Sequence, residues 1–151
     1  MKIYFAGPLF TPAERRFIDE CAVQLRDAGF DVFVPHEHEH ELALDDTVTA
    51  ERIFAKDFDA LAEANAVLAI LDGPVIDDGT ACEIGIFYGL MRSDPAKKGI
   101  VGMTHDLRTM RDSDRQGEVK GLNLFVVGCI EAVGTIVTSL DEAQAVLDGW
   151  R

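Results

Sequence analysis

Short apolar segments alternate with helical segments along this chain, and this alternation constrains its fold more than any other feature. The apolar segments have the length of buried strands. Between them, apolar residues recur at helical spacing, as Phe17, Cys21 and Leu25 do. Strands that alternate with helices favour a parallel sheet with helices on both faces. We therefore expect an α/β fold whose five strands occupy residues 2–6, 31–35, 66–71, 99–103 and 122–127.

The sequence also indicates where helices begin and end. Thr11 followed by Pro12 is typical of a helix start, and Gly29 is placed to end that helix. Residues 36–46 and 105–121 are polar and lack apolar periodicity, so we expect surface loops there. Residues 135–138 and a last helix close the fold. The later helices are expected at residues 47–65, 80–91, 129–132 and 141–150.

One segment joins a buried strand to a helix through an acidic glycine loop. Glu83 lies near the start of that helix, among alanine, cysteine, isoleucine and phenylalanine residues. Burial raises the pKa of a carboxyl group, whereas a nucleophile must be ionised. We therefore interpret Glu83 as a nucleophile kept ionised by donors such as Tyr4 or backbone amides. An aspartate of the loop, Asp77 or Asp78, can protonate a leaving group, which gives a two-carboxylate device for cleaving a glycosidic bond. The structural alternative is that Asp78 or Thr80 only caps the helix.

Length and charge limit the classes of function. With 151 residues the chain fits one domain, residues 1–151. Its formal net charge of -13 argues against nucleic acid or an anionic membrane as partner, because phosphate groups are bound by clustered Lys and Arg. A small neutral ligand fits this charge better. No apolar segment is long enough to span a membrane and the N-terminus lacks a signal-peptide pattern, so we expect a cytoplasmic location.

Cysteines and histidines raise two further site chemistries. The three cysteines lie in apolar contexts and are expected to be reduced structural thiols. Cys82 adjoins Glu83, but no histidine accompanies it as a base, so a catalytic thiol is the weaker interpretation. His36, His38 and His40 alternate with glutamates, yet the spacing of zinc ligands is absent. We expect a solvated segment there and no metal site.

In an open parallel sheet a ligand lies outside the carboxyl ends of the strands, near the point where the strand order reverses. The loops at residues 6–10 and 72–79 and the segment after Met103 reach that edge. Gly7 allows the backbone to approach a ligand there, and Phe5 offers an aromatic wall. The glycine motifs of dinucleotide sites and of nucleoside triphosphate sites are absent, so neither ligand is expected.

Several motifs between residues 2 and 127 resemble those of nucleoside 2-deoxyribosyltransferases. The most diagnostic is the DxGTxxExG pattern of residues 77–85, accompanied in order by KIYFAGPLF, VFVP, KDFDAL, VLAILDG and GLNLFV. The resemblance implies a flavodoxin-like or Rossmann-like doubly wound sheet of strand order 2-1-3-4-5. It also implies transfer of a 2-deoxyribosyl group between nucleobases in nucleotide salvage. That reaction proceeds through a covalent glutamyl intermediate with retention and requires no metal or organic cofactor.

The resemblance implies roles for particular residues. Glu83 matches the nucleophile, Tyr4 the tyrosine that orients it, and Asp57 and Asp77 match aspartates at the sugar and base. We choose Asp77 for proton transfer to and from the base. Asn123 matches an asparagine that reaches the substrate of the adjacent subunit, which implies a dimer or a trimer of dimers. Its alternative is a hydrogen bond at a strand edge. The other predicted substrate contacts are Phe5, Gly7, Phe10, Asp78 and Gly79.

Two other functions remain open from the sequence. A 2'-deoxynucleoside 5'-monophosphate N-glycosidase uses a similar glutamate but binds a phosphate and lets water attack. Its first loop is expected to carry serine or arginine, whereas GPLFTP is apolar, although Arg15 and Arg16 follow closely. A non-catalytic nucleoside or nucleotide sensor with this fold is the third possibility, because a fold alone does not establish chemistry. The joint presence of Tyr4, Asp77, Glu83 and Asn123 speaks against a sensor.

Overall fold

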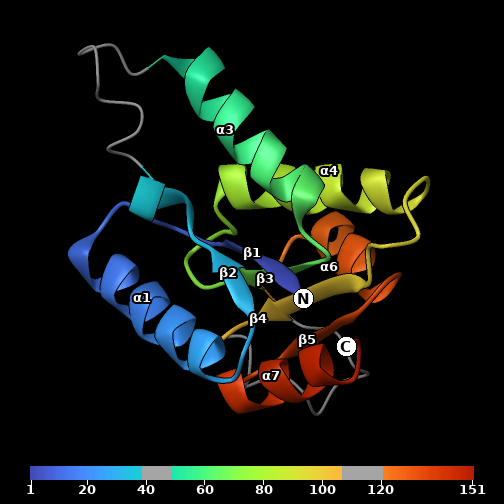
Figure 1. Ribbon diagram of the computed structural model, residues 1–151. Helices are drawn as coiled ribbons and strands as arrows, with labels where there is room; N and C mark the ends of the chain where they lie inside the picture. The colour runs from blue at the N-terminus through green and yellow to red at the C-terminus, as the bar shows by residue number, and fades with distance from the viewer. Residues whose placement is uncertain (39–48, 107–120) are drawn as a thin grey trace.

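Five parallel strands form the central sheet: β1 (Lys2–Ala6), β2 (Asp31–Phe33), β3 (Ala66–Ile70), β4 (Gly99–Met103) and β5 (Thr135–Val137). Their order is β2-β1-β3-β4-β5 (Figure 1). The strand order therefore reverses between β1 and β3. The computed structural model describes residues 1–38, 49–106 and 121–151. The predicted fold class and strand order are confirmed.

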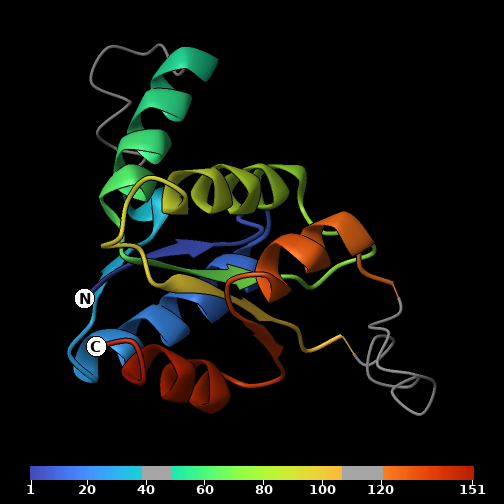
Figure 2. The same cartoon turned by 90° about the vertical axis from the view of Figure 1, so that its right-hand side faces the viewer.

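The sheet is covered by a 3-10 helix, η1 (Pro35–His38), and by the α-helices α1 (Pro12–Asp27), α3 (Ala50–Glu63), α4 (Asp78–Met91), α6 (Leu124–Glu131) and α7 (Leu140–Asp148). Helices α1 and α7 pack on one face, and α3, α4 and α6 pack on the other (Figure 2). Each face has its own apolar cluster, because successive side chains of a strand point to opposite faces. The carboxyl ends of the strands, where a ligand is expected, are thus bordered by helices on both faces of the sheet.

Strand β1 distributes its side chains between the two clusters. Ile3 and Phe5 belong to the cluster under α1 and α7, whereas Tyr4 and Ala6 belong to the cluster under α3, α4 and α6. All four side chains are fully buried. This alternation directs the phenol of Tyr4 toward α4, the helix that carries Glu83.

The first helix begins and ends as predicted. Thr11 caps α1, Pro12 occupies its first turn, and Glu14 completes a capping box with Thr11. After the last turn, Gly29 adopts a φ of 88°. Glycine reaches this left-handed conformation without the steric cost that a side chain imposes.

The predicted strand at residues 122–127 is wrong. Residues Leu124–Glu131 form helix α6, and the fifth strand is β5 at Thr135–Val137. The carboxamide oxygen of Asn123 accepts hydrogen bonds from the backbone N–H groups of Phe125 and Val126, so Asn123 is a helix cap and not a strand-edge residue. An apolar run this short has no periodicity that separates a strand from a helix, and the cap decides in favour of the helix.

Close packing against β4 fixes where the last strand begins. A Cβ atom built on Gly134 would lie 1.8 Å from the carbonyl oxygen of Ile100, a distance that no side chain tolerates. Gly134 therefore allows the chain to enter the sheet directly before Thr135, which pairs with Val101.

Other boundaries differ little from the prediction. Strand β2 ends at Phe33 instead of Pro35, and α3 begins at Ala50 inside the predicted segment 47–65. Most of the two predicted loops, residues 39–46 and 107–120, lies outside the described residues. None of the helices that the described residues form is long and apolar enough to span a lipid bilayer.

Candidate active site

Tyr4 and Glu83 form the centre of the site. The Tyr4 hydroxyl donates a hydrogen bond of 2.5 Å to Oε1 of Glu83, which joins β1 to the first half of α4. Burial, and then the neighbouring charge of Glu83, raise the pKa of Tyr4 far above its ordinary value of 10. The phenol therefore stays protonated and acts as the donor. The predicted pairing of these two residues is present in the structure.

Glu83 is partly buried, and its environment acts on its charge in opposite directions. Its pKa is raised from the ordinary 4.5 to about 7, and burial is the largest cause. The hydrogen bond from Tyr4 lowers the pKa, the charges of Asp57 and Asp77 raise it, and the charge of Lys56 lowers it. A carboxyl group with a pKa near 7 changes its ionisation within the physiological range, which is common at functional sites.

A cavity of about 320 Å³ opens between α3 and α4 beside Glu83. Its walls are mainly apolar and include Phe54, Phe58 and Ile86. The rings of Phe54 and Phe58 stack with their centroids 5.5 Å apart. Asp57 lies on the same wall. Two carboxyl groups in an apolar cavity of this size are typical of a site for a small molecule with a few polar groups.

Asp57 has an unusual electrostatic environment. Its Oδ1 atom is buried and makes no hydrogen bond within the described chain, although Lys56 Nζ lies 3.2 Å away. We regard this contact as an ion pair without hydrogen-bond alignment. Burial raises the pKa of Asp57, and the charge of Lys56 opposes that rise. Lys56 Nζ also donates a hydrogen bond of 2.8 Å to the carbonyl oxygen of Pro35, which fixes the position of the ammonium group. The sequence analysis did not select Lys56, because its position on the helix face is not visible without the fold.

Asp77 is the cap of α4, a role that the sequence analysis assigned to Asp78 or Thr80. Its Oδ2 atom accepts hydrogen bonds of 2.9 Å from the N–H of Thr80 and 3.1 Å from the Thr80 hydroxyl. Asp78 is exposed in the first turn. Gly79 lines the cavity, where an added Cβ would lie 3.1 Å from Oδ2 of Asp77. The cap holds Asp77 close enough to Glu83 to affect the ionisation of Glu83.

Four of the predicted substrate contacts lie away from this cavity. Phe5 is fully buried under α1 and α7, on the face of the sheet opposite to Tyr4. Gly7 follows β1, and a Cβ there would meet Ile18 and Ile70 on the α1 face. Phe10 is 80% exposed, and Asn123 is exposed at the start of α6. The structure therefore brings together Tyr4, Asp57, Asp77, Gly79 and Glu83 but not these four. Asp78 is exposed beside Gly79 and does not line the cavity.

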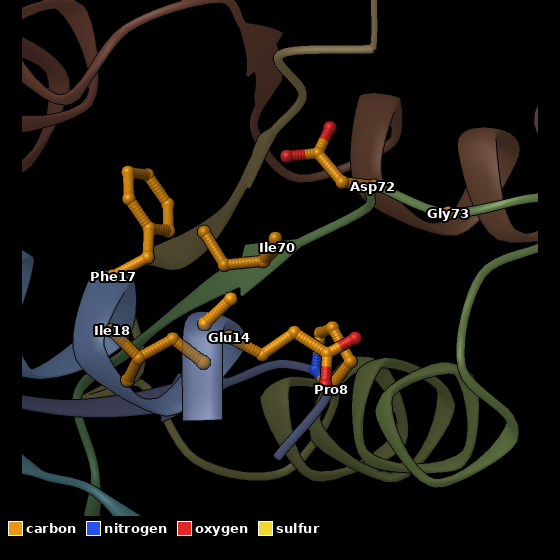
Figure 3. A pocket seen from close by; sticks show the side chains of 8 residues that line it. Pro8, Glu14, Phe17, Ile18, Ile70, Asp72 and Gly73 are labelled. Atoms are coloured by element: carbon orange, nitrogen blue, oxygen red, sulfur yellow. The ribbon is translucent and has the colours of Figure 1, made fainter. Parts of the chain in front are cut away.

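A second cavity of about 270 Å³ lies at the same edge of the sheet, on the α1 face (Figure 3). Pro8, Glu14 and Asp72 are among the residues that line it. Asp72 accepts hydrogen bonds from the Thr104 hydroxyl and from the backbone N–H of His105, so it joins the ends of β3 and β4. The sequence analysis missed Asp72, and the signal for it was an acidic residue directly after a buried strand.

The structure also shows where the cysteines and two of the histidines lie. All three cysteines are unpaired, and Cys82 is exposed on the wall of the Glu83 cavity instead of being a buried thiol. His36 Nε2 lies 2.7 Å from Oδ1 of Asp19, and the His38 ring stacks on Phe33. His40 lies outside the described residues, and the described ones contain no group of three metal-ligating side chains.

Comparison with known proteins gives a family. The family model described as nucleoside 2-deoxyribosyltransferase matches residues 3–143. No curated protein sequence matches the chain significantly.

The solved structures that resemble the fold include the following three. A conserved protein from Enterococcus faecalis V583 is 28% identical with a TM-score of 0.82, and the match covers 99% of this chain and 98% of that one. The 2-deoxyribosyltransferase of Bacillus psychrosaccharolyticus is 22% identical with a TM-score of 0.67, covering 95% and 90%. The 2-deoxyribosyltransferase of Leishmania mexicana is 20% identical with a TM-score of 0.65, covering 95% and 94%.

Proposed function

The chain belongs to the nucleoside 2-deoxyribosyltransferase family. From this premise we propose that it transfers the 2-deoxyribosyl group of a 2'-deoxynucleoside to a second nucleobase, a salvage reaction. The observation that carries the proposal is the hydrogen bond from Tyr4 to Glu83 at the wall of a cavity of small-molecule size. A glutamate held in this way is oriented for attack on a bound sugar.

The reaction has two steps. Tyr4 holds Oε1 of Glu83, so Oε2 is the oxygen that attacks C1' of the sugar. As the oxygen–carbon bond forms, the bond from C1' to the base nitrogen breaks, and its electron pair leaves with the base. Asp77, protonated when the substrate is bound, gives this proton to the departing base and becomes a carboxylate. A second base then attacks the glycosyl ester, returns a proton to Asp77 and releases Glu83. Two inversions at C1' give net retention.

Charge development explains why a 2-deoxy sugar suits this site. The transition state has oxocarbenium character, and the absence of the 2'-hydroxyl removes an electron-withdrawing group. Ionised Glu83 stabilises the positive charge before it bonds to C1'. Asp57 contacts the sugar or base with the buried oxygen that makes no hydrogen bond within the described chain. The phenylalanines of α3 provide an apolar surface for the base. No metal or organic cofactor is needed for these steps.

We also propose a homo-oligomer, a dimer or a trimer of dimers, with sites shared between subunits. Asn123 lies on the surface, where a second subunit can receive its side chain. Leu124 and Phe125 beside it are 70% and 82% exposed. Large apolar side chains grouped at a surface support a protein contact there. The cytoplasmic location and the single domain stay predictions.

The direct test is an exchange assay on purified protein with deoxyinosine as donor and adenine as acceptor, extended to a panel of bases and sugars. Deoxyadenosine formation supports the proposal, and Glu83→Ala must abolish it while the circular dichroism spectrum persists. Soaking the protein with a 2-fluoro-2-deoxynucleoside must give a mass adduct on Glu83. Cleavage of deoxynucleotides by water alone would instead identify a hydrolase. Binding without turnover would identify a sensor.

A further inference from the structure

Lys56 connects helix α3 to the segment that follows β2. Its Nζ atom donates a hydrogen bond of 2.8 Å to the carbonyl oxygen of Pro35, the buried first residue of η1. The Lys56 side chain is only 15% exposed. An ammonium group removed from water in this way needs the partners that surround it. Its position is therefore fixed by the main chain of another element.

The second partner of Lys56 is the residue that follows it. Nζ lies 3.2 Å from Oδ1 of Asp57. Consecutive residues of a helix do not face each other, so helix geometry alone does not produce this ion pair. The hydrogen bond to Pro35 holds the ammonium group beside Asp57. Oδ1 is buried and makes no hydrogen bond within the described chain, so it can still accept one from a ligand.

Asp57 shares its cavity with a second carboxyl group. Asp57 and Glu83 both line the apolar cavity between α3 and α4. Burial is the largest cause that raises the pKa of each, and the charge of Asp57 raises the pKa of Glu83 further. Two anions in one apolar cavity disfavour each other unless a cation is near. The charge of Lys56 is the largest effect that opposes the rise in the pKa of Asp57, and it also lowers the pKa of Glu83.

Other described side chains act on the same two carboxyl groups. Tyr4 of β1 donates its hydrogen bond to Glu83, and the charge of Asp77, the cap of α4, raises the pKa of Glu83. The charge of His38 in η1 lowers the pKa of Asp57, but less than the lysine does. Neither Tyr4 nor Asp77 is a cation. The lysine is therefore the main positive charge that these elements bring to the pair.

We infer that Lys56 is a positioning residue of the proposed reaction. Its ammonium group, held by Pro35, keeps Asp57 anionic and in place to accept a hydrogen bond from the sugar or base while Glu83 attacks. The inference rests on the proposed function, because it assumes a deoxynucleoside in this cavity. Lys56 is not among the described residues that line the cavity, so it acts through Asp57.

The first test compares the wild type with Lys56→Met, Lys56→Arg and Lys98→Met. Methionine is similar in length to lysine but uncharged, whereas arginine keeps its charge at every pH used. Lys98 is exposed directly before β4, at the amino end of the strand, so its substitution removes an equal charge away from the site. The kcat/KM value for exchange between deoxyinosine and adenine is measured from pH 5 to pH 9. Thermal unfolding checks each fold, and Lys56→Gln, which keeps a hydrogen-bond donor, replaces Lys56→Met if the latter does not fold.

Lys56→Met is expected to raise the pH midpoint of kcat/KM by about one unit, because an opposite charge in contact lowers the pKa of a carboxyl group by about that much or more. Below the midpoint, kcat/KM is then about tenfold lower than in the wild type. At pH 9 it recovers to within about threefold, since both carboxyl groups are ionised there. Lys56→Arg and Lys98→Met keep the midpoint within about 0.3 units of the wild-type value. A misplaced helix would instead lower kcat/KM equally at every pH.

A binding measurement separates Asp57 from Glu83. In Glu83→Gln the nucleophile is replaced by a neutral group and the substrate is not turned over, so calorimetry gives the dissociation constant of deoxyinosine directly. Asp57 is then the carboxyl group that the lysine contacts. Adding Lys56→Met to Glu83→Gln is expected to weaken binding about fivefold at pH 5 and less than about twofold at pH 8.

The outcomes separate the role of Lys56 from the proposed function. A wild type that does not exchange deoxyinosine overturns the proposed function itself. A wild type that exchanges it, together with an unshifted pH midpoint in Lys56→Met, overturns the role of Lys56 alone. The same conclusion follows if Lys56→Arg shifts the midpoint as far as Lys56→Met does. It also follows if Lys56→Met weakens binding to Glu83→Gln equally at both pH values.

Discussion

The hydroxyl of Tyr4 and the carboxyl group of Glu83 are 2.5 Å apart, although 79 residues separate them in the chain. Tyr4 is fixed in a buried strand, and Glu83 is fixed in a helix that Asp77 caps. The contact thus depends on the packing of α4 against β1. It lowers the pKa of a carboxyl group that burial otherwise raises. The same contact sets the pH range in which Glu83 is an anion.

Tyr4→Phe is expected to move the pH profile of activity. In the wild type, kcat/KM rises with pH and levels off above about 7, because Glu83 must lose its proton to attack and its pKa is about 7. The phenylalanine variant lacks the hydrogen bond that favours the anion, so its midpoint lies about one pH unit higher. Activity at pH 6 falls most, and activity at pH 9 recovers in part. A uniform loss at every pH would contradict this role of Tyr4.

Glu83→Gln is expected to stabilise the protein at high pH while abolishing transfer. The folded-state pKa of Glu83, about 7, lies above its ordinary value of 4.5. The unfolded chain therefore releases this proton at lower pH than the folded chain does. The stability contributed by the protonated group is present below pH 4.5 and is lost as the pH rises to about 7. Glutamine has no such loss, so at pH 8 the variant gains on the order of 1–3 kcal/mol.

Urea unfolding of both proteins at pH 4.5 and pH 8 measures this effect. The difference between wild type and variant should be small at the lower pH and large at the higher one. Transfer should fall by at least about a thousandfold at either pH. Equal stability differences at the two pH values would show that the carboxyl group is not destabilised by burial.

The sequence was sufficient for the parts of the fold that depend on local signals. Thr11 followed by Pro12, the position of Gly29 and the buried segment before Asp72 predicted α1 and β3 correctly. Asn123 shows where such signals compete, because the apolar residues after it suit a strand and its own side chain starts a helix. The hydrogen bonds that Asn123 accepts from the first turn of α6 decide in favour of the helix.

The motifs predicted the site correctly where their residues lie on elements that meet at one edge of the sheet. Tyr4, Asp57 and Glu83 do come together, since β1, α3 and α4 border one edge. Phe5 does not join them, because its place in the strand alternation turns it to the other face. The cap formed by Asp77 was not predictable, because Asp77, Asp78 and Thr80 are all suitable capping residues within one turn.

Lys97→Met is expected to destabilise the fold without removing a catalytic group. The Lys97 ammonium is buried. It donates hydrogen bonds of 2.6 Å to the carbonyl oxygen of Ala62 and 2.8 Å to that of Ala64, at the C-terminal end of α3. Methionine leaves both acceptors without this donor, at a cost of about 2–4 kcal/mol. Lys98 is exposed, so Lys98→Met serves as the control. Urea unfolding at pH 7 measures both, and equal effects would contradict the role of Lys97.

Asn123→Ser separates the two roles that Asn123 can have. Serine is also a good helix cap, so the free energy of unfolding of this variant should lie within about 0.5 kcal/mol of the wild-type value. Asn123→Ala should lower the free energy of unfolding by about 1 kcal/mol. If the carboxamide completes the site of a neighbouring subunit, Asn123→Ser loses at least about tenfold in kcat/KM despite its retained stability. Full activity of Asn123→Ser would leave Asn123 as a cap alone.

Mixing inactive variants tests whether the site is shared. Glu83→Gln and Asn123→Ser each damage a different part of the site, so either homodimer has two defective sites. After co-refolding, about half of the dimers contain one subunit of each kind. In such a dimer, one site combines Glu83 of one subunit with Asn123 of the other and is intact. Activity therefore returns to about a quarter of the wild-type value. If the site lies within one subunit, the mixture shows only the average of the two separate activities.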